Sequence, residues 1–528
     1  MAQAGGDKVY LMGQIVEDMN LKSKLAEEEV IQILEEAGVI GMTPKQIALK
    51  LNRDISAVES VINKLRKSRE VIRVGRNLWI LSKYYDFSKI SEFTTPEQYK
   101  EEFRRIYGNV FSKCRLKIEA GENCGERIHR WFFCVQGFSA KFVNNMLTRY
   151  NIREGVVLDP YAGTGTVLVC AKMRGINSLG VELLPIFAFA SKVKTDWGVD
   201  IELLKEEASR VLNLSKKWKE EDISHDIFLR ETHRHFTCEN LTKLLVLRKH
   251  ISEVEDRKVR RLLMLALASI LVPCSNLKRS PCLGYAKKSA TDPFIAFKLK
   301  TDQMVEDLTY VQKYNSGAYS EIVIGDSRTV NYAPESIDIA ITSPPYVNGL
   351  DYVINYKIEM AWLNLVRDYE DLSKLKEIMV ACDNIPKGVI KRFSSQKPHY
   401  EDPLLDQIVG KIEEKIKKKG VYRRNDMHLI VRKYFEDIYS TFQRIYEGLK
   451  EGGRFIVVIG DSLVAGVYVP TDLMIAKMGE RIGFSIERIE VARERRSGQR
   501  HDFKLRESIV ILRKGVAKKK SLNLLDFL

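Results

Sequence analysis

The turn at residues 160–165 constrains the fold of this chain more than any other feature. An apolar run, 155–159, leads into Pro-Tyr-Ala-Gly-Thr-Gly, and residues 166–172 continue as a helical pattern. Glycines at a strand-to-helix turn let a ligand approach the backbone closely. A second short run ends in Glu182 about twenty residues further on, where doubly wound folds place a carboxylate against a ribose. The sequence therefore predicts a doubly wound α/β fold with a ribose-containing ligand at this turn.

The glycine spacing narrows the choice of ligand. Nicotinamide dinucleotide sites use Gly-x-Gly-x-x-Gly, whereas residues 163–168 contain only the first two glycines. A phosphate-binding loop requires Gly-Lys-Ser/Thr, which does not occur at this turn. S-adenosylmethionine has a ribose and an adenine but no phosphate, so it remains as the expected cofactor.

A second motif, Thr-Ser-Pro-Pro-Tyr at 342–346, follows the apolar run 337–341. Because proline fixes φ and cannot continue a ladder, the two prolines end the strand and hold the neighbouring carbonyls in one orientation. Ser343 Oγ and the Pro344 carbonyl can then accept hydrogen bonds from an exocyclic base amine, with Tyr346 stacking on the base. A strand followed by a proline-rich loop without chemistry is the alternative, and the cofactor motif upstream weighs against it.

Together, Asp159 to Thr166 and Ser343 to Tyr346 resemble the two motifs of the amino-methyltransferases of nucleic acids, which modify N4 of cytosine or N6 of adenine. Tyr161 stands where phenylalanine is usual. The resemblance implies a Rossmann-like three-layer α/β methyltransferase domain with helical insertions. It assigns a catalytic set, Ser343, Pro344, Pro345 and Tyr346. It also assigns a cofactor-binding set, Asp159, Pro160, Tyr161, Gly163, Gly165, Thr166, Glu182, Asp326, Ser327, Phe138 and Ser139.

The first residue of the tetrapeptide bears on the target base. In the family, Ser is typical of N4-cytosine enzymes, Asp of N6-adenine enzymes, and Asn of adenine or protein glutamine enzymes, so Ser343 favours cytosine N4 over adenine N6. Asn348 and Asp351 are candidates for contacts with the base, with a solvated loop as the alternative. An RNA methyltransferase acting on cytosine of a structured RNA such as rRNA, and a winged-helix regulator that senses the cofactor, remain as alternatives.

The charge balance points to a polyanionic partner. Lys and Arg number 85 against 70 Asp and Glu, a formal net charge of +15, and a basic surface usually serves a polyanion. A solvated Lys/Glu-rich surface, as in heat-adapted proteins, explains the high charge but not the imbalance. No apolar run reaches the length of a membrane span, and the N-terminus lacks a secretory apolar segment. A cytoplasmic protein is expected.

The eight cysteines form no Cys-x-x-Cys pair and no zinc spacing with histidine, so reduced, buried thiols are predicted. His233 and His235 could ligate a metal, but methyl transfer from a sulfonium needs none, and no metal site is predicted. Pro273-Cys274 and Pro281-Cys282 are similar to the Pro-Cys nucleophile of C5-cytosine methyltransferases. Those enzymes lack Ser-Pro-Pro-Tyr, so a covalent mechanism is not expected.

Residues 1–85 predict a winged helix-turn-helix. An apolar helical face lies in 25–37, and Thr43 to Gln46 and Ser56 to Glu59 each form a capping box. Residues 71–81 alternate as a hairpin that turns at 75–77. Basic residues favour duplex nucleic acid as the partner over a docked protein: Lys64, Arg66, Lys67, Arg69, Arg73 and Arg76.

The remaining chain is expected to alternate between the methyltransferase domain and insertions. The tail residues 521–528 resemble the clamp-binding tail of replication and repair proteins, which favours DNA and suggests a sliding clamp as partner; a strap packed on the catalytic domain is the alternative. The expected segments are 86–200 with the cofactor motif, a mostly helical insertion at 201–320 as candidate target-recognition region, 321–365 with the catalytic motif, a basic helical insertion at 366–435, the last strands at 436–514, and a tail at 515–528.

Overall fold

The computed structural model describes residues 27–515 except 38–40, 68–69, 76–77, 82–94, 109, 115–117, 135, 220–222, 224–225, 281, 288, 315–316, 348, 420–422 and 497–503. The chain divides into two compact units, Met1–Val110 and Phe111–Leu528. The clamp-like residues 521–528 and Asn348 lie outside the described residues.

The first unit consists of helices, a hairpin and one further helix. Its elements are a helix at 27–37, α2 (Pro44–Leu51), α3 (Ile55–Lys67), the antiparallel pair β1 (Val71–Gly75) and β2 (Leu78–Leu81), and α4 (Pro96–Tyr107). The expected capping box of α2 is present: Thr43 accepts from the Gln46 N–H, and Gln46 accepts from the Thr43 N–H. The box expected at Ser56 is wrong. Helix α3 already begins at Ile55, and Asp54 accepts from the Ser56 N–H at 3.3 Å, because an Asp side chain satisfies a free N–H of the first turn.

The second unit is built on one eight-stranded, mostly parallel sheet. Across the sheet the strands run in the order β3 (Phe111–Lys113), β13 (Phe484–Arg496), β14 (Lys504–Lys514), β10 (Leu449–Gly460), β9 (Ile337–Thr342), β4 (Val156–Asp159), β5 (Asn177–Glu182) and β8 (Ser320–Ile324). Strand β14 runs antiparallel to both of its neighbours, β10 and β13. Strands β10, β13 and β14, which lie within residues 436–514, are on the side of the sheet away from β8.

The strand order reverses between β4 and β9. From β4 the chain proceeds to β5 and β8 on one side, whereas β9 and β10 lie on the other side, and all these neighbours pair in parallel. In open α/β sheets, ligands bind outside the carboxyl ends of the strands at such a reversal. Both sequence motifs begin there, since the glycine-rich turn follows β4 and Ser-Pro-Pro-Tyr follows β9.

Helices cover both faces of this sheet. Helices α5 (Ala140–Arg149) and α6 (Thr166–Met173) share a core with Ile456 and Val458 of β10. Phe455, directly before Ile456, meets Phe442 of α18 (Met427–Gly448) edge-on, with ring centroids 4.6 Å apart. Since side chains alternate across a strand, α18 lies on the face opposite α5 and α6. Helix α19 (Thr471–Ile482) contacts β10, β13 and β14.

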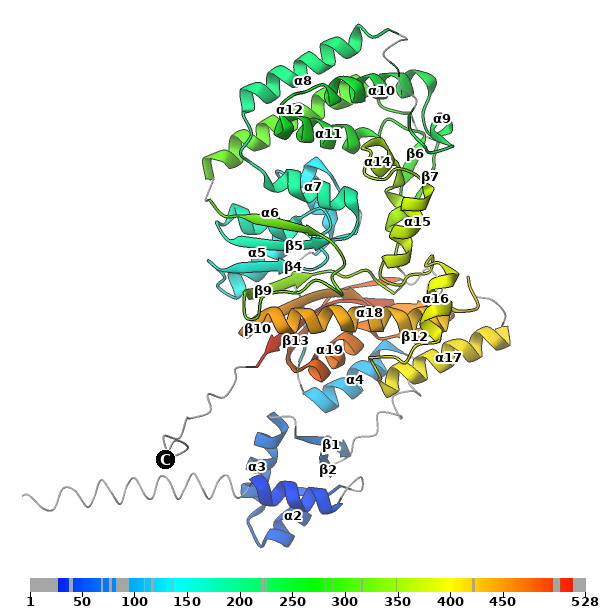
Figure 1. Cartoon of the computed structure of the whole chain (residues 1–528). Coiled ribbons are helices and arrows are strands. Elements are labelled where there is room, and N and C mark those ends of the chain that lie inside the picture. Colours follow the sequence, from blue (N-terminus) through cyan, green and yellow to red (C-terminus); the bar gives the residue numbers. More distant parts are fainter. Residues whose placement is uncertain are drawn as a thin grey trace, which may run out of the picture. The chain divides into compact units, whose positions relative to one another are not determined.

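A group of helices packs beside this sheet and follows β5 in the chain (Figure 1). It contains α7 (Pro185–Thr195), α8 (Ile201–Lys216), α9 (Thr232–His235), α10 (Cys238–Ser252), α11 (Arg257–Ile270) and α12 (Pro293–Val311), with the short pair β6 (Leu277–Arg279) and β7 (Leu283–Tyr285). Two later residues share the core of this helical group. Tyr356 lies at the junction between α13 (Tyr352–Asn355) and α14 (Lys357–Trp362), and Trp362 is the last residue of α14. The chain just after the catalytic motif is thus anchored in the helical group.

A second set of helices separates β9 from β10. It comprises α15 (Tyr369–Ile378), α16 (Lys387–Ser394) and α17 (Pro403–Lys419), and leads into α18; the pair β11 (Ser462–Val464) and β12 (Val467–Val469) follows β10. Within the described residues, no helix is both long and apolar enough to span a bilayer. The eight cysteines, all within the described residues, form no disulfide, but Cys124, Cys238 and Cys282 are exposed, so the expectation that the thiols are buried holds only for part of them.

Candidate functional site

The glycine-rich turn between β4 and α6 has a backbone that only glycine adopts easily. Gly163 and Gly165 have φ of 53° and 84°, in the left-handed region that favours glycine. A side chain on Gly165 would also collide with the hydroxyl of Ser191 on α7. The Asp159 carboxylate accepts from the Tyr161 N–H at 3.1 Å and from the Thr342 hydroxyl at 2.7 Å. The turn is thereby tied both to its own strand and to β9.

Glu182, at the end of β5, holds the same turn from the other side. Its carboxylate accepts from the Gly163 N–H and from the Leu184 N–H, both at 2.7 Å. Burial raises the pKa of Glu182 and of Asp159 to about 7, and for Asp159 the charge of Glu182 adds to the effect. An ionised carboxylate has about four acceptor sites, so each retains capacity for donors of a ligand that enters here.

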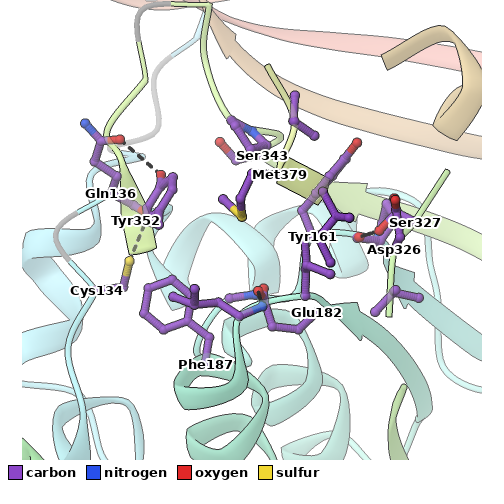
Figure 2. A pocket seen from close by; sticks show the side chains of 18 residues that line it. Cys134, Gln136, Tyr161, Glu182, Phe187, Asp326, Ser327, Ser343, Tyr352 and Met379 are labelled. Atoms are coloured by element: carbon purple, nitrogen blue, oxygen red, sulfur yellow. Dashed lines mark hydrogen bonds between the residues drawn. The ribbon is translucent and has the colours of Figure 1, made fainter. Parts of the chain in front are cut away.

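A pocket of about 670 Å³ opens at the carboxyl ends of β4, β5, β8 and β9. In Figure 2, Ser343 lies at one side of this first pocket, and Glu182 and Phe187 lie at the other. Its lining is formed by Cys134, Gln136, Pro160, Tyr161, Gly163, Val181, Glu182, Leu183, Leu184, Phe187, Asp326, Ser327, Ser343, Pro345, Tyr352, Ile378, Met379 and Val380.

A second pocket, of about 520 Å³, adjoins the first and shares Tyr161, Gly163 and Ser343 with it. Its lining is formed by Asn123, His129, Phe132, Phe133, Cys134, Gln136, Gly137, Phe138, Asp159, Tyr161, Ala162, Gly163, Thr164, Thr166, Lys194 and Ser343. Ser343 therefore stands where the two pockets meet.

The two pockets bring most of the sequence-predicted residues together. The first takes Pro160, Glu182, Asp326, Ser327 and Pro345, the second takes Asp159, Phe138 and Thr166, and Tyr161, Gly163 and Ser343 line both. Among the residues of the catalytic and cofactor-binding sets, which are all described, Ser139, Gly165, Pro344 and Tyr346 line neither pocket. Ser139 instead caps α5, where it accepts from the Phe142 N–H.

Asp326 is held by an arginine that also reaches the second set of helices. Arg328 contacts the Asp326 carboxylate at 2.6 Å and the Asp437 carboxylate of α18 at 2.6 Å. It also donates to the Ile378 carbonyl at 2.6 Å. Residues 378–380, which line the first pocket, are thereby connected to Asp326, one of the residues assigned to cofactor binding.

Tyr346 is fixed by strands far along the chain. Its hydroxyl donates to Glu507 of β14 at 2.6 Å, and the Arg495 guanidinium lies 5.6 Å from the ring centroid. A side chain on Gly460 would meet the ring at 2.9 Å. The sheet therefore holds the Tyr346 ring beside the residues that line the pockets, and the expected stacking on a base depends on this position.

Tyr161, which stands where the family usually has phenylalanine, uses its hydroxyl inside the structure. Its oxygen lies 2.8 Å from Thr441 Oγ1 on α18. The departure adds a link between the glycine-rich turn and α18, while the ring still lines both pockets.

Several lining residues lie outside both sequence motifs. The Tyr352 hydroxyl donates to Gln136 at 3.1 Å, and its ring meets Phe187 edge-on with centroids 6.0 Å apart. Met379 comes from the loop after α15. Phe187 lies close in sequence to Glu182, and Tyr352 lies close to Ser343, which is a weak signal that both belong to the site. No sequence pattern indicates Met379.

Asp351, considered above for contacts with a base, serves a helix instead. Its side chain accepts from the Ile354 N–H at 2.9 Å and pairs with Lys376 at 2.9 Å. Cys274 is fully buried within the helical group and lines neither pocket, which disfavours a cysteine nucleophile there. Throughout the part of the chain that the structure describes, no three His, Cys, Asp or Glu side chains cluster as a metal site.

The paired pockets fit a nucleoside that carries an amino-acid arm. Acids that can accept from ribose hydroxyls and a base amine line the first pocket, and the second presents Asp159 and two threonines beside the glycine-rich turn. S-adenosylmethionine has these parts, and Ser343 lies at the junction, where the part of the molecule between them would be.

Comparisons with known proteins identify families and relatives that this chain resembles. A family profile of N6 and N4 methyltransferases, described as DNA methylase, matches residues 23–190. The Type II methyltransferase M.BsoBI of Geobacillus stearothermophilus is 26% identical over 467 residues, which cover 77% of this chain and 89% of that protein. M.AvaI of Nostoc sp. is 26% identical over 436 residues, which cover 75% and 89%. M.MjaII of Methanocaldococcus jannaschii is 22% identical over 313 residues, which cover 41% and 58%. The glycine-rich turn, the Ser-Pro-Pro-Tyr segment and these similarities support an N6/N4 DNA methyltransferase family for this chain.

Proposed function

We propose that this protein transfers the methyl group of S-adenosylmethionine to the exocyclic N4 amine of cytosine at specific sites in DNA. The observation that carries the proposal is the position of Ser343. Ser343 directly follows β9 and lines both pockets. It lies next to the glycine-rich turn, which follows the neighbouring strand β4. An amine bound at Ser343 would therefore lie beside the middle of a cofactor that occupies both pockets.

The residues divide the work by their chemistry. S-adenosylmethionine, when bound, supplies a methyl group activated by a sulfonium. Glu182 and Asp326 line the first pocket and accept from the ribose hydroxyls and the adenine amine, while Phe138 and Asp159 line the second, at the amino-acid arm. Fixed positions of amine and methyl group provide much of the rate acceleration in such a reaction.

Ser343 acts on the target amine. The lone pair of a cytosine or adenine amine is delocalised into the ring, so acceptors for its N–H groups are needed to draw it toward tetrahedral geometry. Ser343 Oγ and the Pro344 carbonyl serve as these acceptors, and they bind more strongly as positive charge develops on the nitrogen. The base must first leave the duplex, because its amine is paired there. Serine in this position supports cytosine over adenine.

The first unit supports site-specific action on DNA. A helix at 27–37, α2, α3 and the β1–β2 hairpin follow one another in winged-helix order. The exposed face of α3 presents small polar and charged side chains, Ser56, Glu59, Ser60, Asn63 and Lys64. We propose that this unit binds duplex DNA, with Arg66 of α3 and Arg73 of β1 at phosphates. The Type II methyltransferases among the relatives support a restriction-modification setting.

Methylation of purified DNA and RNA tests the reaction directly. The protein is incubated with S-adenosylmethionine and either genomic DNA or ribosomal RNA, and the digested nucleosides are identified by mass spectrometry. We expect N4-methyldeoxycytidine from DNA. The variant Ser343→Ala should lose roughly a hundredfold or more in rate and retain its affinity for S-adenosylhomocysteine.

Each alternative has its own product. N6-methyldeoxyadenosine would move the target to adenine, and a methylated nucleoside from RNA alone would replace DNA as the substrate. Cofactor binding without any methylated nucleoside would favour a cofactor-sensing regulator. An unchanged rate in Ser343→Ala would remove Ser343 from the reaction.

A further inference from the structure

The second pocket contains a buried lysine outside both sequence motifs. Lys194 lies near the end of α7, and its side chain is 1% exposed. Its ammonium donates to the carbonyls of His129 at 3.1 Å and Phe132 at 2.7 Å. Lysine is almost never fully buried unless it is paired. Among the described residues, however, no Asp or Glu side chain forms an ion pair with Lys194.

The donors of Lys194 are incompletely used by these contacts. An ammonium carries three N–H donors, and the two carbonyls account for two of them. Lys194 is also part of the pocket lining, together with Asp159 and the hydroxyl residues Thr164 and Thr166. The second pocket therefore presents one ammonium and one carboxylate, and its other titratable wall residues include the neutral His129.

This pair of charges is complementary to an α-amino acid, which carries one carboxylate and one ammonium of its own. We propose that Lys194 binds the carboxylate of the methionine part of S-adenosylmethionine, while Asp159 faces its ammonium. The proposal rests on the proposed function, because it assumes that this cofactor occupies the two pockets. It makes Lys194 a cofactor-binding residue rather than only an anchor for the 129–132 segment.

The electrostatic surroundings of Lys194 are consistent with a role that depends on an incoming anion. The pKa of Lys194 is lowered to about 7, mainly by burial; Cys134 opposes this shift, and the charge of Lys300 contributes to it. His129 stays neutral near pH 7, because burial and the charge of Lys194 lower its pKa to about 3. A bound carboxylate favours the protonated ammonium. Affinity for a ligand with this carboxylate should therefore fall as pH rises through about 7.

Binding of three related ligands separates this role from a structural one. Calorimetry compares S-adenosylmethionine, its decarboxylated form and 5′-methylthioadenosine, which lacks the amino-acid arm. The variants are Lys194→Met, which keeps an unbranched side chain one atom shorter and without the charge, and Lys192→Met. Lys192 lies on the same helix outside both pockets, so it serves as the matched control.

We expect the wild-type protein and Lys192→Met to bind S-adenosylmethionine roughly ten- to a hundredfold more tightly than the decarboxylated form, as for a hydrogen bond between charged groups. In Lys194→Met this difference should shrink to less than about threefold, with unchanged affinity for 5′-methylthioadenosine. The decline in S-adenosylmethionine affinity above about pH 7 should also disappear in this variant.

The results that would contradict the role of Lys194 differ from the result that would contradict the proposed function. Equal preference for the carboxylate in Lys194→Met and wild type would overturn the role of Lys194. A parallel loss of affinity for all three ligands would show that Lys194 only supports the fold of the pocket. If the wild-type protein bound none of the three, the proposed cofactor itself would be wrong.

Discussion

The hydroxyl of Thr342 donates to the carboxylate of Asp159 at 2.7 Å. Thr342 is the last residue of β9, directly before Ser343, and Asp159 is the last residue of β4, directly before the glycine-rich turn. Both side chains are buried. One hydrogen bond thus joins the segment expected to bind the target amine to the segment expected to bind the cofactor, at the point where the strand order reverses.

Replacing Thr342 by valine should weaken cofactor binding, most strongly at acidic pH. The Thr342 hydrogen bond lowers the pKa of Asp159, whereas burial raises it to about 7. Without the hydroxyl this pKa should rise further. Since the protonated acid cannot pair with an ammonium, the loss of affinity below about pH 7 should then begin at higher pH. Calorimetry with S-adenosylhomocysteine between about pH 6 and 8 measures this shift.

Two variants control that experiment. Thr342→Ser keeps the hydroxyl and should leave the pH profile unchanged. Asp159→Asn should remove the part of the affinity loss below about pH 7 that is due to this residue. The part due to Glu182, whose pKa burial also raises to about 7, should remain. A Thr342→Val profile that coincides with that of the wild type would contradict the link between the hydrogen bond and the cofactor.

Gly460→Ala should impair methyl transfer without affecting cofactor binding. A Cβ at this position would lie 2.9 Å from the ring of Tyr346, which β10 and β14 hold in place. The ring would have to shift, and misplacement of about 1 Å in a reacting site can cost roughly a hundredfold in rate. Single-turnover kinetics and S-adenosylhomocysteine titration separate the two effects. Gly410→Ala on α17, where a Cβ meets nothing within 4 Å, is the control; normal turnover in Gly460→Ala would show that the ring position is unimportant.

Arg328→Leu should destabilise the second unit and loosen the wall of the first pocket. It would leave the Asp326 and Asp437 carboxylates without the cation that joins them at 2.6 Å, and breaking a buried pair typically costs about 3–5 kcal/mol. We expect a fall in Tm of about 5 °C or more and weaker binding of the adenosine part. Arg367→Leu removes a pair whose arginine side chain is 80% exposed, so its Tm should barely change. Equal Tm values for the two variants would argue against the buried network.

Arg66→Gln combined with Arg73→Gln should weaken DNA binding at low salt and leave the methylated sequence unchanged. Contacts to phosphate add affinity without base information, and each neutralised phosphate contributes about 0.9 to the slope of log K against log salt. The slope should therefore decrease by about 1.8, measured by fluorescence anisotropy. The Lys versions of both substitutions keep the charges and should retain the slope. A changed methylation site would instead make this unit the sequence reader.

The sequence alone determined the local parts of the site. The apolar run of β4, the glycines of the following turn and the prolines after β9 each impose their conformation through neighbouring residues, so their positions agree with the structure. The capping box at Thr43 formed for the same reason. The box at Ser56 did not, because Asp54, two residues earlier, offered a competing acceptor.

The tertiary structure decided which distant residues meet at these local parts. Thr342 and Asp159 are 183 positions apart, and Tyr346 and Glu507 are 161 apart. Contacts over such separations leave no periodicity in the sequence, because they depend on how strands far apart in the chain are brought together by the segments between them. The position of the Lys194 ammonium also depends on tertiary contacts. In the sequence Lys194 is one lysine in an apolar helix, and only the packing of α7 against the 129–132 segment buries its ammonium in a pocket wall.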